Sequence, residues 1–130
     1  MQDEGAWIRH NIRYYSELHG VNTYNALAVA YCESRFKNVP SVNYPKEDSF
    51  GPFQEQSEFW KENATLRGMI SDPKLRKSIE ANIEMAMWRV SNYGWGRWTC
   101  KPGSKDVLLQ KKELDRILAE DSSTLFNRTE

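Results

Sequence analysis

One apolar segment, residues 24–36, constrains the fold of this chain more than any other feature of its sequence. It reads YNALAVAYCESRF. The run is rich in alanine, exceeds the usual length of a strand and lacks the period of two that a half-buried strand shows. These features predict a buried helix with Thr23 as its N-cap and an end near Arg35. Glu33 is the only carboxylate in the run, so we expect one acidic side chain on an otherwise apolar helix.

Four more helices are expected where apolar residues recur every three or four positions, at about residues 6–19, 56–63, 73–93 and 104–120. Gly20 stops the first of them. Ser71 and Asp72 provide an N-cap before Pro73, which opens the third, and we expect that helix to be the longest. The last is amphipathic and begins after Ser104.

The stretch between these helices from residue 37 to 51 is crowded with Asn, Pro, Ser and Asp. Such residues favour turns, so we expect an irregular loop or a small hairpin that lines a cleft. The chain contains no internal repeat and no low-complexity linker. We therefore predict a mainly α fold of about five or six helices, in a single domain over residues 1–130.

The overall charge excludes several classes of partner. Acidic and basic residues balance at 18 each, so no net field draws the chain to nucleic acid or to anionic lipid. No apolar run approaches the roughly 20 residues that span a bilayer. The N-terminal stretch MQDEGAWIRH lacks the basic and then apolar pattern of a secretory signal. We expect either a signal that has been removed or another route to the target, such as a phage particle.

The two cysteines, Cys32 and Cys100, are far apart and form no CxxC pair, which argues against zinc and against a thioredoxin-like redox site. In an oxidising compartment they would form one disulfide, and in the cytosol they would be thiols. His10 and His19 have no Cys, Asp or Glu partner at ligand spacing. We therefore expect no metal site and no cofactor.

Glu33 is the candidate for acid chemistry. Ala30, Tyr31, Cys32 and Phe36 surround it in the sequence, and such an apolar setting raises the pKa of a carboxyl group. A carboxylic acid that keeps its proton near neutral pH can protonate a glycosidic oxygen. Taken alone, however, a glutamate near a helix end is more often a solvated surface charge.

A second candidate contact with a ligand follows the polar loop. Gly51 allows the backbone to approach a ligand closely, and Gln54 offers one acceptor and two donors to the acetamido or hydroxyl groups of an amino sugar. The alternative interpretation is that these residues form a turn before a helix with a polar first turn and contact no ligand.

Three motifs favour the functional interpretation. The run ALAVAYCESRF, the later FGPFQ with Trp60 after it, and GWGRWTC resemble the catalytic domain of resuscitation-promoting factors, a lysozyme-like family that acts on bacterial cell walls. The resemblance covers residues 24–100. ESRF followed by GPFQ is also similar to soluble lytic transglycosylases and goose-type lysozymes. The chain departs from the resuscitation family at Arg35 and Phe36, where that family has glycines, and at Phe59, where it has threonine.

The resemblance implies a lysozyme-like fold and a set of site residues. Glu33 would be the general acid, Gln54 a substrate contact, and Cys32 with Cys100 a structural disulfide. Further contacts with the sugar are expected from four residues near these motifs: Ser34, Phe53, Tyr93 and Trp95.

We therefore expect a peptidoglycan-cleaving muramidase, a lytic transglycosylase that cuts the MurNAc-GlcNAc β-1,4 bond with one glutamate as acid and base. One alternative is a hydrolytic lysozyme, which needs a second carboxylate; the candidates are Glu47, Asp48 and Glu55, with Asp48 put first. The other is a non-catalytic wall-binding or virion structural module. The expected partner is the glycan strand, and the expected state is a monomer that is extracytoplasmic or virion-associated.

Overall fold

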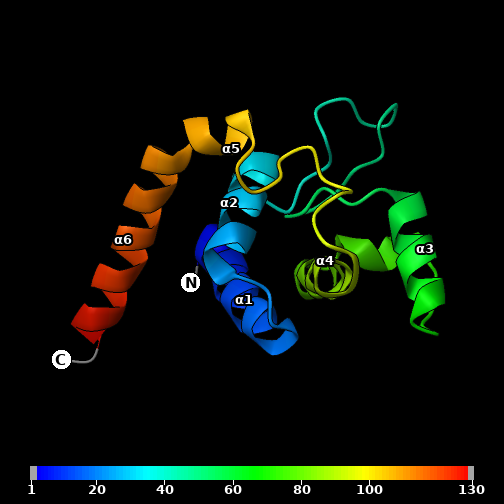
Figure 1. Cartoon of the computed structure of the whole chain (residues 1–130), viewed down its shortest axis with the longest axis horizontal. Coiled ribbons are helices and arrows are strands. Elements are labelled where there is room, and N and C mark those ends of the chain that lie inside the picture. Colours follow the sequence, from blue (N-terminus) through cyan, green and yellow to red (C-terminus); the bar gives the residue numbers. More distant parts are fainter. Residues whose placement is uncertain (1–2, 129–130) are drawn as a thin grey trace.

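A computed structural model describes residues 3–128 of the chain, and these residues are mainly helical (Figure 1). The elements in order are α1 (Glu4–His19), α2 (Thr23–Ser34), α3 (Ser57–Leu66), the 3₁₀ helix η1 (Pro73–Lys77), α4 (Ile79–Tyr93), α5 (Lys105–Leu109) and α6 (Lys111–Arg128). The described residues form no β-strand, and two isolated β-bridges join Pro40 to Phe50 and Phe50 to Glu55. The prediction of a mainly α fold is confirmed.

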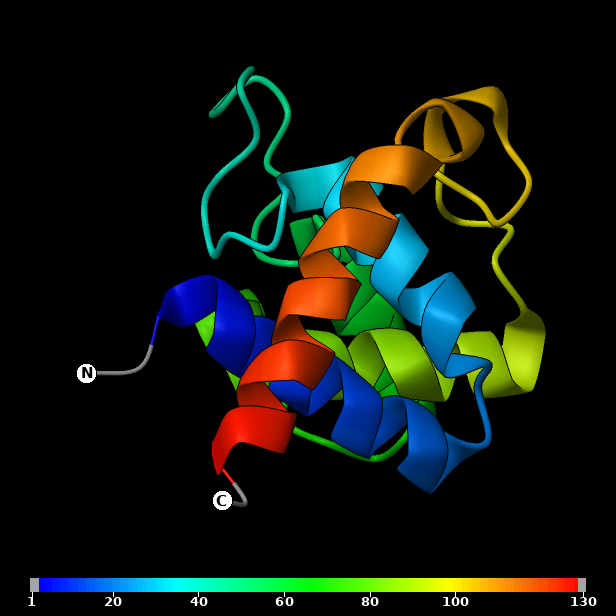
Figure 2. The same ribbon diagram turned by 90° about the vertical axis from the view of Figure 1, so that its left-hand side faces the viewer.

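The core lies between α1, α2 and α4. Helix α1 packs on both α2 and α4, and its Ile8 and Ile12 are fully buried. The run predicted to be a buried helix is α2, which buries every residue from Ala26 to Tyr31. Helix α6 crosses the outside of α1 and α2 (Figure 2), where Asp121 binds Arg9 and Arg13 at 2.6 and 2.9 Å.

The predicted end of the first helix is confirmed, and the predicted N-cap of the second helix is displaced by one residue. Gly20 has a φ of 70° and ends α1 with two backbone hydrogen bonds, as the sequence predicts. The N-cap of α2 is Asn22, whose side chain accepts from the N–H of Asn25. Thr23 was expected in that role, but it is the first helical residue, and its hydroxyl lies 2.6 Å from that of Ser16.

The helix predicted over residues 73–93 is divided in two. Asp72 caps η1 as expected, because its side chain accepts from the N–H of Lys74. At Ser78 the backbone is extended, with a ψ of 133°, and the serine side chain caps the new helix α4 at Ala81. The longest helix is α6 and not this one.

The C-terminal helix is also divided, and it is longer than predicted. Ser104 caps α5 as expected, but the helix ends before Gln110 and α6 begins at Lys111. Helix α6 continues to Arg128, beyond the predicted end near residue 120. The ion pairs of Asp121 hold this part of α6 on α1. Among residues 3–128, no helix is long and apolar enough to cross a membrane.

Candidate active site

A cavity of about 300 Å³ opens where the end of α2 meets the polar loop, the start of α3 and the segment after α4. Its lining is mostly polar, and it consists of Glu33, Glu47, Ser49, Gln54, Glu55, Gln56, Glu58, Phe59, Arg97, Trp98 and Thr99. The volume lies at the lower end of the range for small-molecule sites. Two predicted site residues, Glu33 and Gln54, therefore share one cavity.

Glu33 lies in the last turn of α2 and is only partly exposed. The backbone N–H of Cys100 donates a hydrogen bond to its Oε2 at 3.4 Å. The pKa of Glu33 is raised to about 6, mainly by burial and to a smaller extent by the negative charge of Glu47, while the hydrogen bond from Cys100 acts in the opposite direction. A carboxyl group in this state holds a proton in mildly acidic solution and can donate it.

The end of α2 is fixed to the loop that forms the cavity wall. Ser34 was expected to contact the substrate, but it is buried, and its hydroxyl donates to the carbonyls of Ala30 at 3.0 Å and Pro52 at 2.9 Å. It does not line the cavity. Its hydrogen bonds instead connect the helix that carries Glu33 to the segment that carries Gln54.

The two residues after Ser34 have a backbone conformation that favours glycine. Arg35 and Phe36 have φ values of 57° and 60°, in the left-handed region that glycine adopts most easily. The Arg35 side chain compensates by donating to the last carbonyls of α2, on Tyr31 and Cys32. Phe36 is buried beside Tyr31. Two large side chains therefore occupy a backbone conformation typical of glycine.

Cys32 and Cys100 form a disulfide, with their Cα atoms 5.9 Å apart. It joins the last turn of α2 to the segment after α4, which supplies Trp98 and Thr99 to the cavity. The pairing that the resemblance implied is therefore present, directly beside Glu33.

Gln54 and Gly51 hold the wall of the cavity in an unusual conformation. Gln54 has a φ of 48°, and its Nε2 donates to the carbonyls of Val39 and Gly51 at 2.9 and 3.0 Å. Gly51 has a φ of 87°, and a Cβ atom there would lie 2.4 Å from Nδ2 of Asn82. Gly51 therefore makes room for Asn82, and it does not line the cavity.

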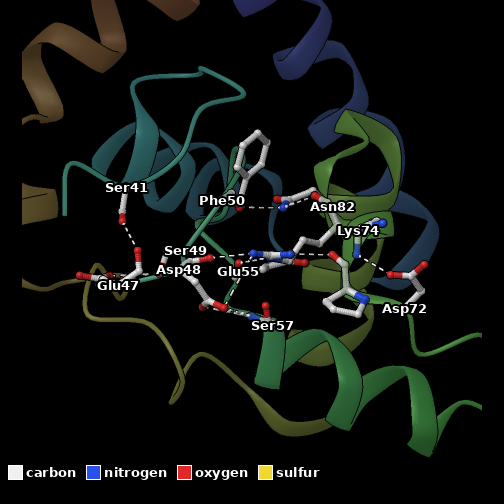
Figure 3. Close-up of polar contacts among 12 residues, drawn as sticks. Ser41, Glu47, Asp48, Ser49, Phe50, Glu55, Ser57, Asp72, Lys74 and Asn82 are labelled. Atoms are coloured by element: carbon white, nitrogen blue, oxygen red, sulfur yellow. Dashed lines mark hydrogen bonds and ion pairs between the residues drawn. The ribbon is translucent and has the colours of Figure 1, made fainter. Parts of the chain in front are cut away.

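Asn82 is a positioning residue that the sequence did not reveal. It is fully buried on α4, and its Nδ2 donates to the carbonyl of Phe50 (Figure 3). Its Oδ1 accepts from the N–H of Phe53. Both bonds hold the loop segment that forms the wall. A polar residue on a buried helix face was the only signal available.

Three aromatic residues that were expected to bind sugar lie outside the cavity lining. Phe53 is fully buried and packs against Trp95 and Trp98. Tyr93 is exposed beyond the end of this cluster and contacts Trp88. The aromatic residue that does line the cavity is Trp98, whose indole N–H donates to the carbonyl of Phe53 at 3.0 Å. Phe53 and Trp95 therefore contact the cavity wall through Trp98.

Two of the three candidate second carboxylates, Asp48 and Glu55, do not present their carboxyl groups to the cavity. Asp48 accepts from the backbone N–H of Ser57 at 3.2 Å, which satisfies the start of α3 (Figure 3). The hydrogen bonds from Ser57 are the main reason that its pKa is lowered. Asp48 is absent from the cavity lining. The carboxylate that lines the cavity from this loop is its neighbour Glu47, which accepts from the hydroxyl of Ser49 at 3.1 Å.

Glu55 lines the cavity but has its carboxyl group in the interior. The residue is 2% exposed, and both carboxyl oxygens are buried without a hydrogen-bond partner. Burial raises its pKa well above the usual value, although the charge of Arg76 opposes this. The Arg76 guanidinium itself donates to the carbonyls of Glu55 and Asp48. The carboxyl group of Glu55 thus lies in the core under the cavity wall, where burial favours its protonated form.

Among the described residues, no group of three or more His, Cys, Asp or Glu side chains is arranged to hold a metal ion. The chain matches no protein-family model, no curated protein and no solved structure. Function must therefore be inferred from the site itself.

Proposed function

We propose that this protein cleaves the glycan strands of peptidoglycan as a lytic transglycosylase, with Glu33 as its general acid and base. The observation that carries the proposal is a half-buried carboxyl group with a pKa of about 6 in the wall of a polar cavity. Such a group can be protonated when substrate binds and ionised after it has transferred its proton. The motif resemblance at residues 24–100 supplies the substrate class.

In the proposed reaction Glu33 protonates the oxygen that links muramic acid to glucosamine. The same side chain, now ionised, accepts the proton of the muramic 6-hydroxyl as that oxygen closes on the anomeric carbon. Gln56 and Thr99 line the same cavity and provide donors and acceptors for hydroxyl and acetamido groups. Gln54, whose amide nitrogen already donates to Val39 and Gly51, provides its Oε1 as an acceptor. No cofactor takes part in this scheme.

A hydrolytic lysozyme is the second candidate, because Glu47 also lines the cavity. A carboxylate opposite the acid could activate a water molecule and give an inverting hydrolase. Under either proposal the protein acts outside the cytoplasm or from a virion. The disulfide supports such an oxidising setting, because disulfides are rare in the cytosol.

Mass spectrometry of purified peptidoglycan digested with the protein tests these alternatives. A lytic transglycosylase releases fragments with anhydromuramic ends, and a hydrolase releases fragments with reducing ends. A wall-binding or virion structural module would bind the sacculus and release neither product. Reducing ends alone would refute transglycosylation, and the absence of both products would refute the enzymatic proposal.

A further inference from the structure

Glu47 is an exposed loop residue whose carboxylate and backbone carbonyl both accept hydrogen bonds. Its Oε1 accepts from the hydroxyl of Ser49 at 3.1 Å, and its backbone carbonyl accepts from the hydroxyl of Ser41 at 2.7 Å (Figure 3). The N–H of Ser41 donates in turn to the carbonyl of Ser49 at 2.9 Å. Ser49 is itself buried and lines the cavity. The two serines therefore fix both the backbone and the carboxylate of Glu47.

The other charged residues of the cavity are arranged differently. Arg97 pairs with Glu62 at 3.2 Å and stacks on Phe59. Glu55 has its carboxyl in the core, and Glu58 is exposed at the start of α3. Of all these charges, it is Glu47 whose field reaches the carboxyl of Glu33 strongly enough to raise its pKa.

We propose that Glu47 is a second catalytic carboxylate, an anion fixed by Ser49 that stabilises positive charge on the sugar ring as Glu33 cleaves the bond. This inference rests on the proposed function. Glycoside cleavage passes through a transition state that resembles an oxocarbenium ion. An anion that is already held in place lowers the energy of such a state, because it needs little reorganisation when the charge develops.

The reaction balances without a covalent role for Glu47. Glu33 gives its proton to the glycosidic oxygen, and the electron pair of the breaking C–O bond stays on that oxygen in the leaving sugar. The muramic 6-hydroxyl then bonds to the anomeric carbon and returns its proton to Glu33. Glu47 stays ionised throughout and neither gains nor loses a bond.

The experiment compares Glu47→Gln with wild type across a range of pH on purified peptidoglycan. We expect the plateau rate to fall on the order of 100-fold, the scale seen when one preorganised electrostatic contact is removed. The alkaline limb of the profile should also move to lower pH, because loss of the Glu47 charge lowers the pKa of Glu33. An NMR titration of the Glu33 carboxyl without substrate should show the same direction.

Two further variants make the test specific. Glu17→Gln removes an exposed carboxylate from α1, away from the cavity, and should keep wild-type activity. Glu58→Gln also removes a carboxylate from the cavity lining, but Glu58 is not hydrogen-bonded to Ser49. An equal loss in Glu47→Gln and Glu58→Gln would overturn the proposal, because the effect would then be one of general charge.

The remaining outcomes separate this inference from the proposed function. If the wild-type protein cleaves peptidoglycan and Glu47→Gln has the same pH–rate profile as wild type, the role of Glu47 is overturned while the proposed function stands. If Glu47→Gln loses only the products with reducing ends, Glu47 acts as a general base that activates water. That result would also contradict a purely electrostatic role. A wild-type protein that cleaves no glycan would remove both proposals.

Discussion

The backbone N–H of Cys100 donates to Oε2 of Glu33, and the disulfide joins Cys100 to Cys32, the residue that precedes Glu33. One covalent bond therefore fixes the candidate acid and the donor that contacts it. Residues distant in sequence are brought to one point beside the cavity. The structure predicts that the stability of the fold and the position of Glu33 depend on the same bond.

Removal of the disulfide in a Cys32→Ala, Cys100→Ala variant should lower the free energy of unfolding by about 4 kcal/mol, because the unfolded chain loses a long closed loop. Denaturant unfolding of wild type and variant under non-reducing conditions measures this difference. Equal midpoints and slopes for the two proteins would contradict the prediction.

Activity should fall as the pH rises through about 6, because the proposed acid then loses its proton. The folded pKa of Glu33 lies above its usual value, so the proton is held more tightly in the folded state. The contribution of Glu33 to stability is therefore fully present below about 4.5 and declines as the pH approaches 6. Glu33→Gln should flatten this decline, which unfolding curves at pH 4 and pH 7 would reveal. A steeper decline in the variant would show that the sign is wrong.

Glu55→Gln should reduce the loss of stability at alkaline pH. Burial raises the folded pKa of Glu55, so the folded state holds a proton that the unfolded chain releases as the pH rises above about 4.5. Glutamine cannot ionise, and the dependence of unfolding free energy on pH should be weaker in the variant. Denaturant unfolding at pH 5 and pH 8 measures it, with Glu17→Gln as the exposed control. Parallel curves for the Glu55 variant and wild type would show that this carboxyl is not buried in solution.

Gly51→Ala should destabilise the cavity wall by more than Gly103→Ala does. Both glycines have a positive φ, but a Cβ at Gly51 would lie 2.4 Å from Asn82, whereas at Gly103 it meets open space. The strain of a positive φ costs about 1 kcal/mol at either site, so the difference between the variants reports the contact with Asn82. Thermal or denaturant unfolding of both gives this difference. Equal losses would contradict the close packing at Gly51.

Local signals in the sequence predicted the helices well, because caps and stops act over a few residues. Gly20 and Ser104 perform the roles expected of them. The breaks at Ser78 and Gln110 were missed, since each lies inside a continuous apolar pattern. At Ser78 the break depends on a serine that caps the next helix from within the pattern. Both sides of such a break look helical when the sequence is read alone.

The site was predicted in part. Glu33 and Gln54 line one cavity, as their motifs indicated. The burial of Phe53 and the roles of Asp48 and Glu47 could not be predicted, because they depend on which way neighbouring loop residues face. Asp48 caps α3 while Glu47, one residue earlier, lines the cavity. The order of residues in a loop does not determine which side chain caps a helix and which one lines a cavity.

The most direct test of the account is the rate at which Glu33→Gln solubilises purified peptidoglycan, compared with wild type at pH 5. Binding of both proteins to the insoluble wall is measured in the same samples. We expect the variant to bind the wall but to release no fragments. Release at the wild-type rate by Glu33→Gln would contradict it, because the glycan would then be cleaved without the acid on which the proposal rests.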